Sequence, residues 1–445
     1  MSKNSKKYHI WVLGCQMNLS DGEKIEKILS DLKFQKTDSE KEADVIIVVS
    51  CSIRQVVIDK ILRRAKNWQR KRKAKLLTTI VTGCVVDADK EKMSGFFDYV
   101  LDIKEIEELK NILRSNISLS SVIPAKAGIQ RTWIPGHPGL DPGPNDIEVD
   151  NYLNISSNHQ SSFQAYVPIM TGCNNFCSYC VVPYVRGREK SRPAKEIINE
   201  CKKLIEQGYK EIVLLGQNVN SYDGGKLNFP KLLSEIDKIK GDFWMRFLTS
   251  HPKDLSNELI DVMKNGRHIT PYLHLAVQSG DNKILQAMNR KYKIERFVEI
   301  VQKARKAIPG IMISTDVIVG FPGETKKQFN NTLKLFKQVG FDMAYISKFC
   351  ARKGTEAAKL KDNILDKEKE NRKNIINEEL KKSALEINRR YIGRKVKVLV
   401  DEFKNGKCSG KTDTFKTVVF TGDKKMIGKF IEVEIKRADT WALFG

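Results

Sequence analysis

The sequence predicts an α/β protein of three parts: an N-terminal parallel α/β domain, a partial (βα)6 barrel and a small C-terminal β-barrel. Three observations predict this class. Short apolar, β-rich runs alternate with helical patterns along most of the 445 residues, as in βαβ units. A stretch rich in proline and glycine interrupts the alternation once. From Tyr391 onward the apolar period changes to two, which is typical of antiparallel strands.

The N-terminal part repeats one pattern three times, an apolar run followed by a cysteine. The predicted parallel strands are Tyr8–Leu13, Asp44–Val49 and Leu77–Thr82, with helices at Asp21–Leu32 and Val56–Lys73. The strands end on or beside Cys15, Cys51 and Cys84. Because the carboxyl ends of parallel strands meet at one edge of a sheet, we expect these thiols to meet in space. The alternative is three unrelated thiols in the core, where free cysteine is common.

The composition changes between Ser121 and Asp146, which contain five prolines and four glycines. No apolar period survives there, so a flexible linker or insertion is predicted. The expected division is an N-terminal domain over 1–120, an insertion and linker over 121–160, a central domain over 161–385 and a C-terminal β-barrel over 386–445.

The central part contains about six βα units, which predict an open or partial barrel with its chemistry at the carboxyl ends of the strands. The predicted strands are Gln164–Met170, Glu211–Leu215, Trp244–Thr249, Tyr272–Val277, Ile311–Val319 and Met343–Phe349. The predicted helices include Ala194–Gln207, Pro230–Lys240, Lys283–Asn289, Ile294–Lys306 and Lys326–Val339. A charged amphipathic helix, Asp366–Arg390, connects this part to the β-rich tail.

The net charge of +24 and the pI near 9.5 indicate a polyanionic partner, most simply nucleic acid. Lys60–Lys75 holds nine basic residues and no acid, and the tail from Arg389 holds fourteen Lys and Arg against seven Asp and Glu. For Lys60–Lys75 the alternative is a solvated helix face. For the tail the alternative is a domain that only packs against the rest of the chain. The candidate RNA contacts are Arg63, Arg64, Lys71, Arg72, Lys73 and Arg186.

No secretory signal or membrane span is predicted, because the apolar run near the start is too short. A cytoplasmic protein is therefore expected. Its nine cysteines favour metal binding or catalysis over disulfides, since that compartment keeps thiols reduced.

The stretch Thr171–Cys180, TGCNNFCSYC, places Cys173, Cys177 and Cys180 within eight residues and offers no fourth ligand. Structural zinc normally takes four protein ligands. A [4Fe–4S] cluster on three cysteines instead leaves one iron open to a substrate or cofactor. A chance cluster of thiols and a weak zinc site are the alternatives.

The spacing C-x3-C-x2-C resembles the motif of radical S-adenosylmethionine (SAM) enzymes. The resemblance implies that Cys173, Cys177 and Cys180 hold a catalytic [4Fe–4S] cluster, whose open iron binds SAM and whose electron cleaves it. Other residues match the order of SAM-binding positions in that family. They are Tyr179 beside the adenine, Gly216, Gln217 and Asn218 after the next strand, then Ser250, Gln278 and Asp316.

The N-terminal motifs GCQMN, CSIR and TGC extend the resemblance to the radical-SAM methylthiotransferase family. It implies that Cys15, Cys51 and Cys84 hold a second, auxiliary [4Fe–4S] cluster, and that the tail is an RNA-binding TRAM barrel. Within the family, CVVPYVRGREKSRP and LLGQNVNSY resemble the MiaB type, which acts on N6-isopentenyladenosine at tRNA position 37. Relatives that modify threonylcarbamoyladenosine or a ribosomal-protein aspartate remain alternatives, as does a non-catalytic iron–sulfur RNA-binding protein.

The resemblance implies methylthiolation of adenine carbon 2, with SAM serving as both methyl donor and radical source. The implied partners are the tRNA anticodon stem-loop and an electron donor such as flavodoxin or ferredoxin, and a monomer is expected. The chain departs from the family at the 121–146 insertion, at Ser50, and at Cys350 and Lys353 in a turn that usually carries proline. Cys201, Cys350 and Cys408 are expected to be ordinary thiols.

Overall fold

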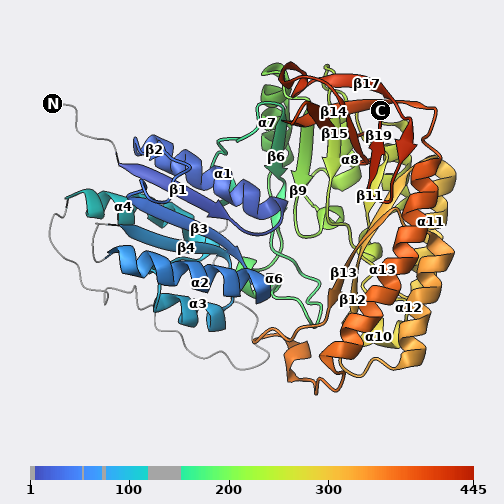
Figure 1. Cartoon of the computed structure of the whole chain (residues 1–445), viewed down its shortest axis with the longest axis horizontal. Coiled ribbons are helices and arrows are strands. Elements are labelled where there is room, and N and C mark those ends of the chain that lie inside the picture. The colour runs from blue at the N-terminus through green and yellow to red at the C-terminus, as the bar shows by residue number, and fades with distance from the viewer. Residues whose placement is uncertain (1–5, 53–54, 73–76, 119–151) are drawn as a thin grey trace.

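The computed structural model describes residues 6–52, 55–72, 77–118 and 152–445, without the side chains of 71–72 and 115–118. The N-terminal α/β domain lies beside the central domain, and the C-terminal strands cover one end of the central domain (Figure 1). The predicted insertion lies outside the described residues.

The N-terminal domain is built on a parallel sheet of five strands in the order β2-β1-β3-β4-β5. The strands are β1 (Lys7–Val12), β2 (Gln35–Lys36), β3 (Val45–Cys51), β4 (Thr78–Cys84) and β5 (Tyr99–Val100). The helices are α1 (Gln16–Asp31), α2 (Gln55–Arg72), α3 (Asp87–Ser94), η1 (Ile103–Glu108) and α4 (Leu109–Ser118).

Helices cover both faces of this sheet. Successive residues of β3 point to opposite faces and are apolar on both. Val45 and Ile47 pack in one core with Ile25 of α1. Ile46 packs in the other with Ile58 of α2. This three-layer arrangement explains why the strand is apolar throughout.

The central domain forms a curved, six-stranded parallel wall around one large core. Two sheets, β10-β9-β6 and β11-β12-β13, are joined by the isolated bridges Met245–Ile269 and Ser250–Leu275. The strands are β6 (Gln164–Pro168), β9 (Glu211–Leu215), β10 (Trp244–Phe247), β11 (Tyr272–His274), β12 (Met312–Val319) and β13 (Met343–Lys348). The predicted partial barrel is therefore confirmed.

Short elements and helices complete the central domain. The short strands are β7 (Met170–Thr171) and β8 (Lys190–Ser191), and the 3₁₀ turns are η2 (Val219–Ser221), η3 (Pro252–Asp254) and η4 (Glu356–Lys359). The helices are α6 (Val182–Arg186), α7 (Ala194–Glu206), α8 (Phe229–Asp237), α9 (Asn257–Asn265), α10 (Asn282–Ala287), α11 (Ile294–Ala307), α12 (Lys326–Val339) and α13 (Asp366–Arg389). Of these helices, α9 is not among those predicted from the sequence.

The tail folds into a curled, six-stranded sheet, as predicted, in the order β17-β14-β15-β16-β19-β18. Its elements are β14 (Lys395–Lys404), β15 (Lys407–Thr412), β16 (Thr417–Thr421), η5 (Lys424–Met426), β17 (Phe430–Glu434), β18 (Arg437–Ala438) and β19 (Ala442–Phe444).

A buried arginine attaches this tail to the central domain. Arg246 donates from Nη1 to the Asp413 carbonyl and from Nη2 to the Thr412 carbonyl, each at 2.6 Å, while Nε pairs with Glu211. Glu211 is the first residue of β9. The tail therefore covers the amino ends of the barrel strands, opposite the end where the cysteines lie.

Two candidate cysteine centres

The N-terminal site, defined as Cys15, Cys51 and Cys84, lies at the carboxyl edge of the N-terminal sheet. Cys51 and Cys84 are the last residues of β3 and β4 and are direct register partners. Cys15 immediately precedes α1. Asn18 lies between Cys15 and Cys84, with its Oδ1 3.5 Å from Cys15 Sγ and its Nδ2 4.0 Å from Cys84 Sγ. The sheet therefore brings together three thiols that are far apart in sequence.

The core site, defined as Cys173, Cys177 and Cys180, is a loop between β7 and α6 at the carboxyl end of the barrel. The Cys180 amide donates to the Cys177 carbonyl at 2.9 Å, which folds the loop back on itself. Burial raises the pKa of the Cys173 and Cys180 thiols, and the neighbouring Cys177 raises both further. The three sulfurs thus lie close enough to interact electrostatically.

Both sites offer thiols without oxygen ligands, which suits iron–sulfur clusters. In the described part of the chain, no three His, Cys, Asp or Glu side chains are arranged to hold a single metal ion. A cubane takes one thiolate at each of several irons, so its ligands surround a volume and need not converge on a point. The donor sets therefore fit clusters better than zinc.

Buried polar atoms without partners lie at the carboxyl ends of the barrel strands. Gln217 Oε1, Ser250 Oγ, His251 Nε2 and Gln278 Oε1 have no hydrogen-bond partner among the described residues. Buried polar groups are nearly always paired, so this concentration indicates a polar ligand. Three of the four, Gln217, Ser250 and Gln278, are predicted SAM contacts.

Three residues that no sequence pattern predicted connect these atoms to the core site: His251, Arg290 and Tyr292. Arg290 Nη1 lies 3.7 Å from Cys177 Sγ, and its guanidinium lies 5.2 Å from the Tyr292 ring centre. The Tyr292 ring lies edge-on to His251 at 5.6 Å. Burial and the Arg290 charge lower the pKa of His251 to about 2, so its imidazole stays neutral. Residues spread over some forty positions give no local sequence pattern, so only the fold reveals this group.

The other predicted SAM contacts have mixed surroundings. Asn218 is already engaged, because Nδ2 donates to Asp254 at 2.7 Å and Oδ1 accepts from the His251 amide at 3.1 Å. A Cβ on Gly216 would lie 2.5 Å from Met170 Cγ, which explains the glycine. Asp316 is half-buried beside His274, and Tyr179 packs against an apolar cluster that includes Phe321.

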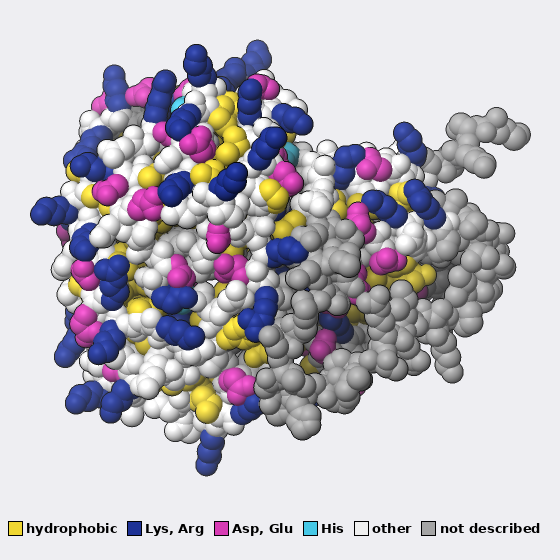
Figure 2. Space-filling view, turned by 180° about the vertical axis from the view of Figure 1, so that it is seen from behind, with side chains coloured by type: hydrophobic (Ala, Val, Ile, Leu, Met, Phe, Trp, Pro, Cys, Tyr) yellow, Lys and Arg dark blue, Asp and Glu magenta, His cyan; other side chains and the backbone are white. Residues whose placement is uncertain are grey.

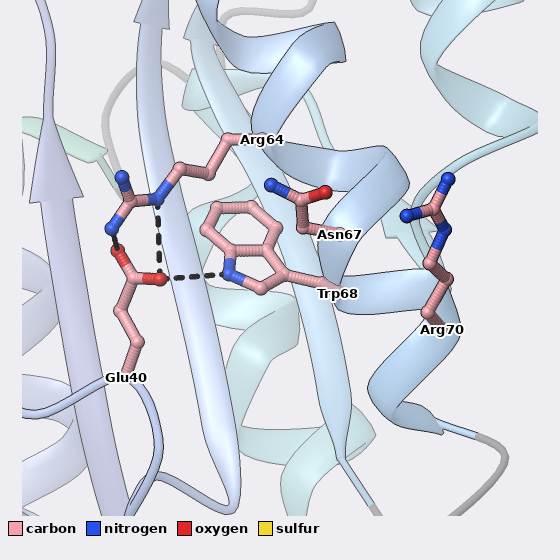
Figure 3. A pocket seen from close by; sticks show the side chains of 5 residues that line it. All are labelled: Glu40, Arg64, Asn67, Trp68 and Arg70. Atoms are coloured by element: carbon pink, nitrogen blue, oxygen red, sulfur yellow. Dashed lines mark hydrogen bonds and ion pairs between the residues drawn. The ribbon is translucent and has the colours of Figure 1, made fainter.

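Two of the predicted RNA contacts, Arg63 and Arg64, lie exposed on α2. Arg64 and the Trp68 indole both bind Glu40, beside a cavity of about 470 Å³ that Asn67 and Arg70 also line (Figure 3). Lys73 and the side chains of Lys71 and Arg72 lie outside the described residues. Seen from behind the view of Figure 1, the surface carries Lys and Arg spread among fewer Asp and Glu (Figure 2).

Arg186 is not placed where RNA could reach it. Its side chain is 1% exposed and pairs with Asp21 of the N-terminal domain at 2.5 Å. The burial contradicts the prediction that Arg186 contacts RNA. The burial of Arg186 could not be predicted, because a run of basic residues around α6 does not show which side chain points inward.

The three remaining cysteines, which the sequence predicts to be ordinary thiols, differ in burial. Cys201 and Cys408 are fully buried in apolar cores. Cys350 is exposed and lies in a loop after β13. Among the described helices, none combines the length and apolar character needed to cross a membrane.

Comparison with known families divides the chain into three matches. Residues 7–102 match the uncharacterized protein family UPF0004, residues 167–336 match the Radical SAM superfamily, and residues 389–445 match the TRAM domain. These segments contain the N-terminal site, the core site and the C-terminal sheet respectively.

Solved structures share the fold at low identity. A radical SAM methyltransferase, TsrM from Kitasatospora setae, determined with cobalamin and a [4Fe–4S] cluster, superposes with a TM-score of 0.56. Its identity is 13%, and the match covers 80% of this chain and 74% of TsrM.

Curated relatives match over nearly their full length. A tRNA-2-methylthio-N6-dimethylallyladenosine synthase of Clostridium novyi (strain NT) is 40% identical over 99% of this chain and 96% of the relative. The synthase of the same name from Thermodesulfovibrio yellowstonii is 40% identical over 98% of this chain and 97% of the relative. At this identity and coverage, the chain belongs to the tRNA-2-methylthio-N6-dimethylallyladenosine synthase family of radical SAM enzymes.

Proposed function

We propose that this protein attaches a methylthio group to carbon 2 of N6-isopentenyladenosine at tRNA position 37. The observation that carries the proposal is the pair of three-cysteine sites, one on each α/β unit, joined through α6. Relatives of the same length that carry this activity in their names support it over threonylcarbamoyladenosine modification and over a non-catalytic RNA-binding role.

In this proposal the core site holds a [4Fe–4S] cluster and SAM. Gln217, Ser250 and Gln278 supply hydrogen bonds to the polar groups of SAM, which would satisfy their unpaired atoms. Neutral His251 offers one more nitrogen to the same ligand. Gly216, Asn218, Tyr179 and Asp316 would shape and line the pocket around them.

The N-terminal site would hold a second [4Fe–4S] cluster on Cys15, Cys51 and Cys84. With SAM, the two clusters supply the radical and sulfur-transfer chemistry, which is the cofactors' own. The chain's part is to hold both sites at fixed positions and to keep their surroundings dry. The apolar contact of Val86 with Val181 and Val185 beside Cys84 supports that role.

The tRNA anticodon stem-loop would be the substrate, bound by basic side chains of α2 and by the C-terminal sheet. Arg63 and Arg64 are the described α2 candidates, and Lys71, Arg72 and Lys73 extend the same basic run. A base in a single-stranded loop leaves its stack at little cost, which gives access to carbon 2. We place the reaction in the cytoplasm, on a monomer reduced by a flavodoxin- or ferredoxin-like protein.

The test is the iron and sulfide content after anaerobic reconstitution. The wild-type chain should bind about eight irons, and the Cys15/Cys51/Cys84 triple alanine about four. Mass spectrometry of tRNA nucleosides then shows whether the methylthio product forms. About four irons in both proteins would leave the N-terminal thiols without a cluster and would reject the proposal.

A further inference from the structure

A buried ion pair joins the two cysteine sites. Arg186 ends α6, six residues after Cys180, and Asp21 lies on α1, six residues after Cys15. Their side chains are 1% and 0% exposed and meet at 2.5 Å. A buried charge pair is favourable only when its remaining donors and acceptors are also satisfied.

The hydrogen bonds of the Arg186 guanidinium all go to the N-terminal domain and its linker. Nη2 binds Asp21, Nη1 lies 3.3 Å from Tyr152 Oη, and Tyr152 in turn donates to Asp21 at 2.6 Å. The third guanidinium nitrogen, Nε, lies 3.0 Å from Cys84 Sγ. An arginine of α6, the helix that follows the core site, thus contacts a sulfur of the N-terminal site.

Asp21 reaches the same sulfur by a second route. It accepts from Asn18 Nδ2 at 3.2 Å, and that amide lies 4.0 Å from Cys84 Sγ. The closer contact to Cys84 is therefore the guanidinium. In the core site the corresponding contact is looser, because Arg290 Nη1 is 3.7 Å from Cys177 Sγ.

We propose that Arg186 is a positioning residue that ties the N-terminal site to the core site through its hydrogen bond to Cys84 Sγ. The proposal rests on the proposed function, because it takes Cys84 to be a cluster ligand. Hydrogen bonds to ligand sulfurs withdraw electron density and raise the reduction potential of a cluster. Arg186 therefore makes the N-terminal cluster easier to reduce and fixes its orientation relative to the core loop.

The experiment measures this potential in the full-length chain with Cys173, Cys177 and Cys180 replaced by alanine, so that the N-terminal cluster is the only one titrated. Arg186→Lys keeps a cation against Asp21, but one ammonium cannot contact Asp21, Tyr152 and Cys84 Sγ with the geometry of a guanidinium. We expect a more negative midpoint potential in a titration followed by electron paramagnetic resonance. The matched control is Arg192→Lys, which changes a buried arginine of the same segment that binds Glu200 and the Pro168 carbonyl.

Asp21→Asn provides a second variant with the opposite expected sign. It removes the negative charge and leaves the guanidinium beside Cys84, so the potential should become more positive. A general loosening of the domain contact would move both variants in the same direction. Arg186→Lys should also leave the core cluster's potential unchanged in the Cys15/Cys51/Cys84 triple-alanine chain.

Three results would overturn the inference. One is a potential in Arg186→Lys equal to that of its parent and of Arg192→Lys. Another is a shift of the same sign in Arg186→Lys and Asp21→Asn. If the parent lacking the core cysteines binds no iron at all, the proposed function fails first and takes this inference with it.

Discussion

The two cysteine sites hold the same number of thiols but are built in opposite ways. The core site is local, with eight residues of one loop, whereas the N-terminal site collects one cysteine from each of three strand ends. Around the core site, amide, imidazole, guanidinium and hydroxyl atoms have no hydrogen-bond partner among the described residues. Beside the N-terminal site, the unpaired buried atoms of the described residues are hydroxyls of Ser20, Ser50 and Thr82.

Beside the N-terminal site the charged and amide side chains pair with one another, whereas several around the core site have no hydrogen-bond partner among the described residues. Asn18, Asp21, Tyr152 and Arg186 satisfy one another around Cys84. The polar atoms around the core site would be satisfied by the SAM that the proposed function places there. A polar cofactor therefore fits the core site, whereas the N-terminal network is suited to holding its cluster in one orientation.

The largest expected effect separates the sites by function. Cys173→Ala should lose both SAM cleavage and the methylthio product, because it removes a ligand of the cluster that is proposed to bind SAM. The Cys15/Cys51/Cys84 triple alanine should keep SAM cleavage and lose only the product. Chromatography of 5′-deoxyadenosine and nucleoside mass spectrometry measure the two activities. SAM cleavage by Cys173→Ala at the wild-type rate would contradict the assignment of the core site.

The second-largest expected effect concerns how iron retention at each site depends on the asparagine beside its cysteines. Asn18 contacts Cys15 and Cys84, whereas Asn175 lies 3.5 Å from Cys173 alone. Because loss of a residue behind metal ligands weakens binding by about 10–100-fold, Asn18→Ala should release iron from the N-terminal site much faster. Asn175→Ala should have the smaller effect, on the core site. Chelator-challenge kinetics, followed by iron absorbance, measure both, and equal rates in the two variants would remove the distinction.

A third prediction concerns the unpaired Ser250 hydroxyl. Ser250→Ala should weaken SAM binding by up to about tenfold, the value of one hydrogen bond, without lowering the stability of the ligand-free protein. The control is Ser52→Ala, because Ser52 Oγ already binds Asp89 at 2.8 Å and the Val86 amide at 3.2 Å. That variant should lose stability and keep SAM affinity. Calorimetric titration and urea unfolding measure the pair, and a stability loss in Ser250→Ala would show that its hydroxyl has a protein partner.

The smallest expected effect concerns the pH dependence of stability and arises from Lys24 of α1. Its ammonium donates to the Tyr152 and Ile155 carbonyls, and burial lowers its pKa from 10.5 to about 8. Between these values the unfolded chain binds more protons than the folded chain, so the free energy of unfolding rises with pH. The gain from pH 8 to 9 is about 1 kcal/mol. Urea unfolding of Lys24→Met should lack this increment, and a slope equal to that of the wild type would place the pKa of Lys24 elsewhere.

The sequence by itself determined the repeated elements and the chemistry of the ligands. The strand Glu211–Leu215 and the helix Lys326–Val339 form with the predicted bounds, because their apolar periods are local properties of the chain. The cysteine spacing of the core site is local too. The three N-terminal thiols were also expected to meet, because parallel strands end at one edge.

The tertiary structure decided which polar side chains point inward and what they bind. Nothing local distinguishes Arg186 from Arg188, which is exposed, yet the Arg186 guanidinium lies buried between Asp21 and Cys84. The group of His251, Arg290 and Tyr292 likewise exists only once two separate loops lie side by side. Burial and pairing depend on contacts between distant segments, whereas periodicity and spacing depend on neighbours along the chain.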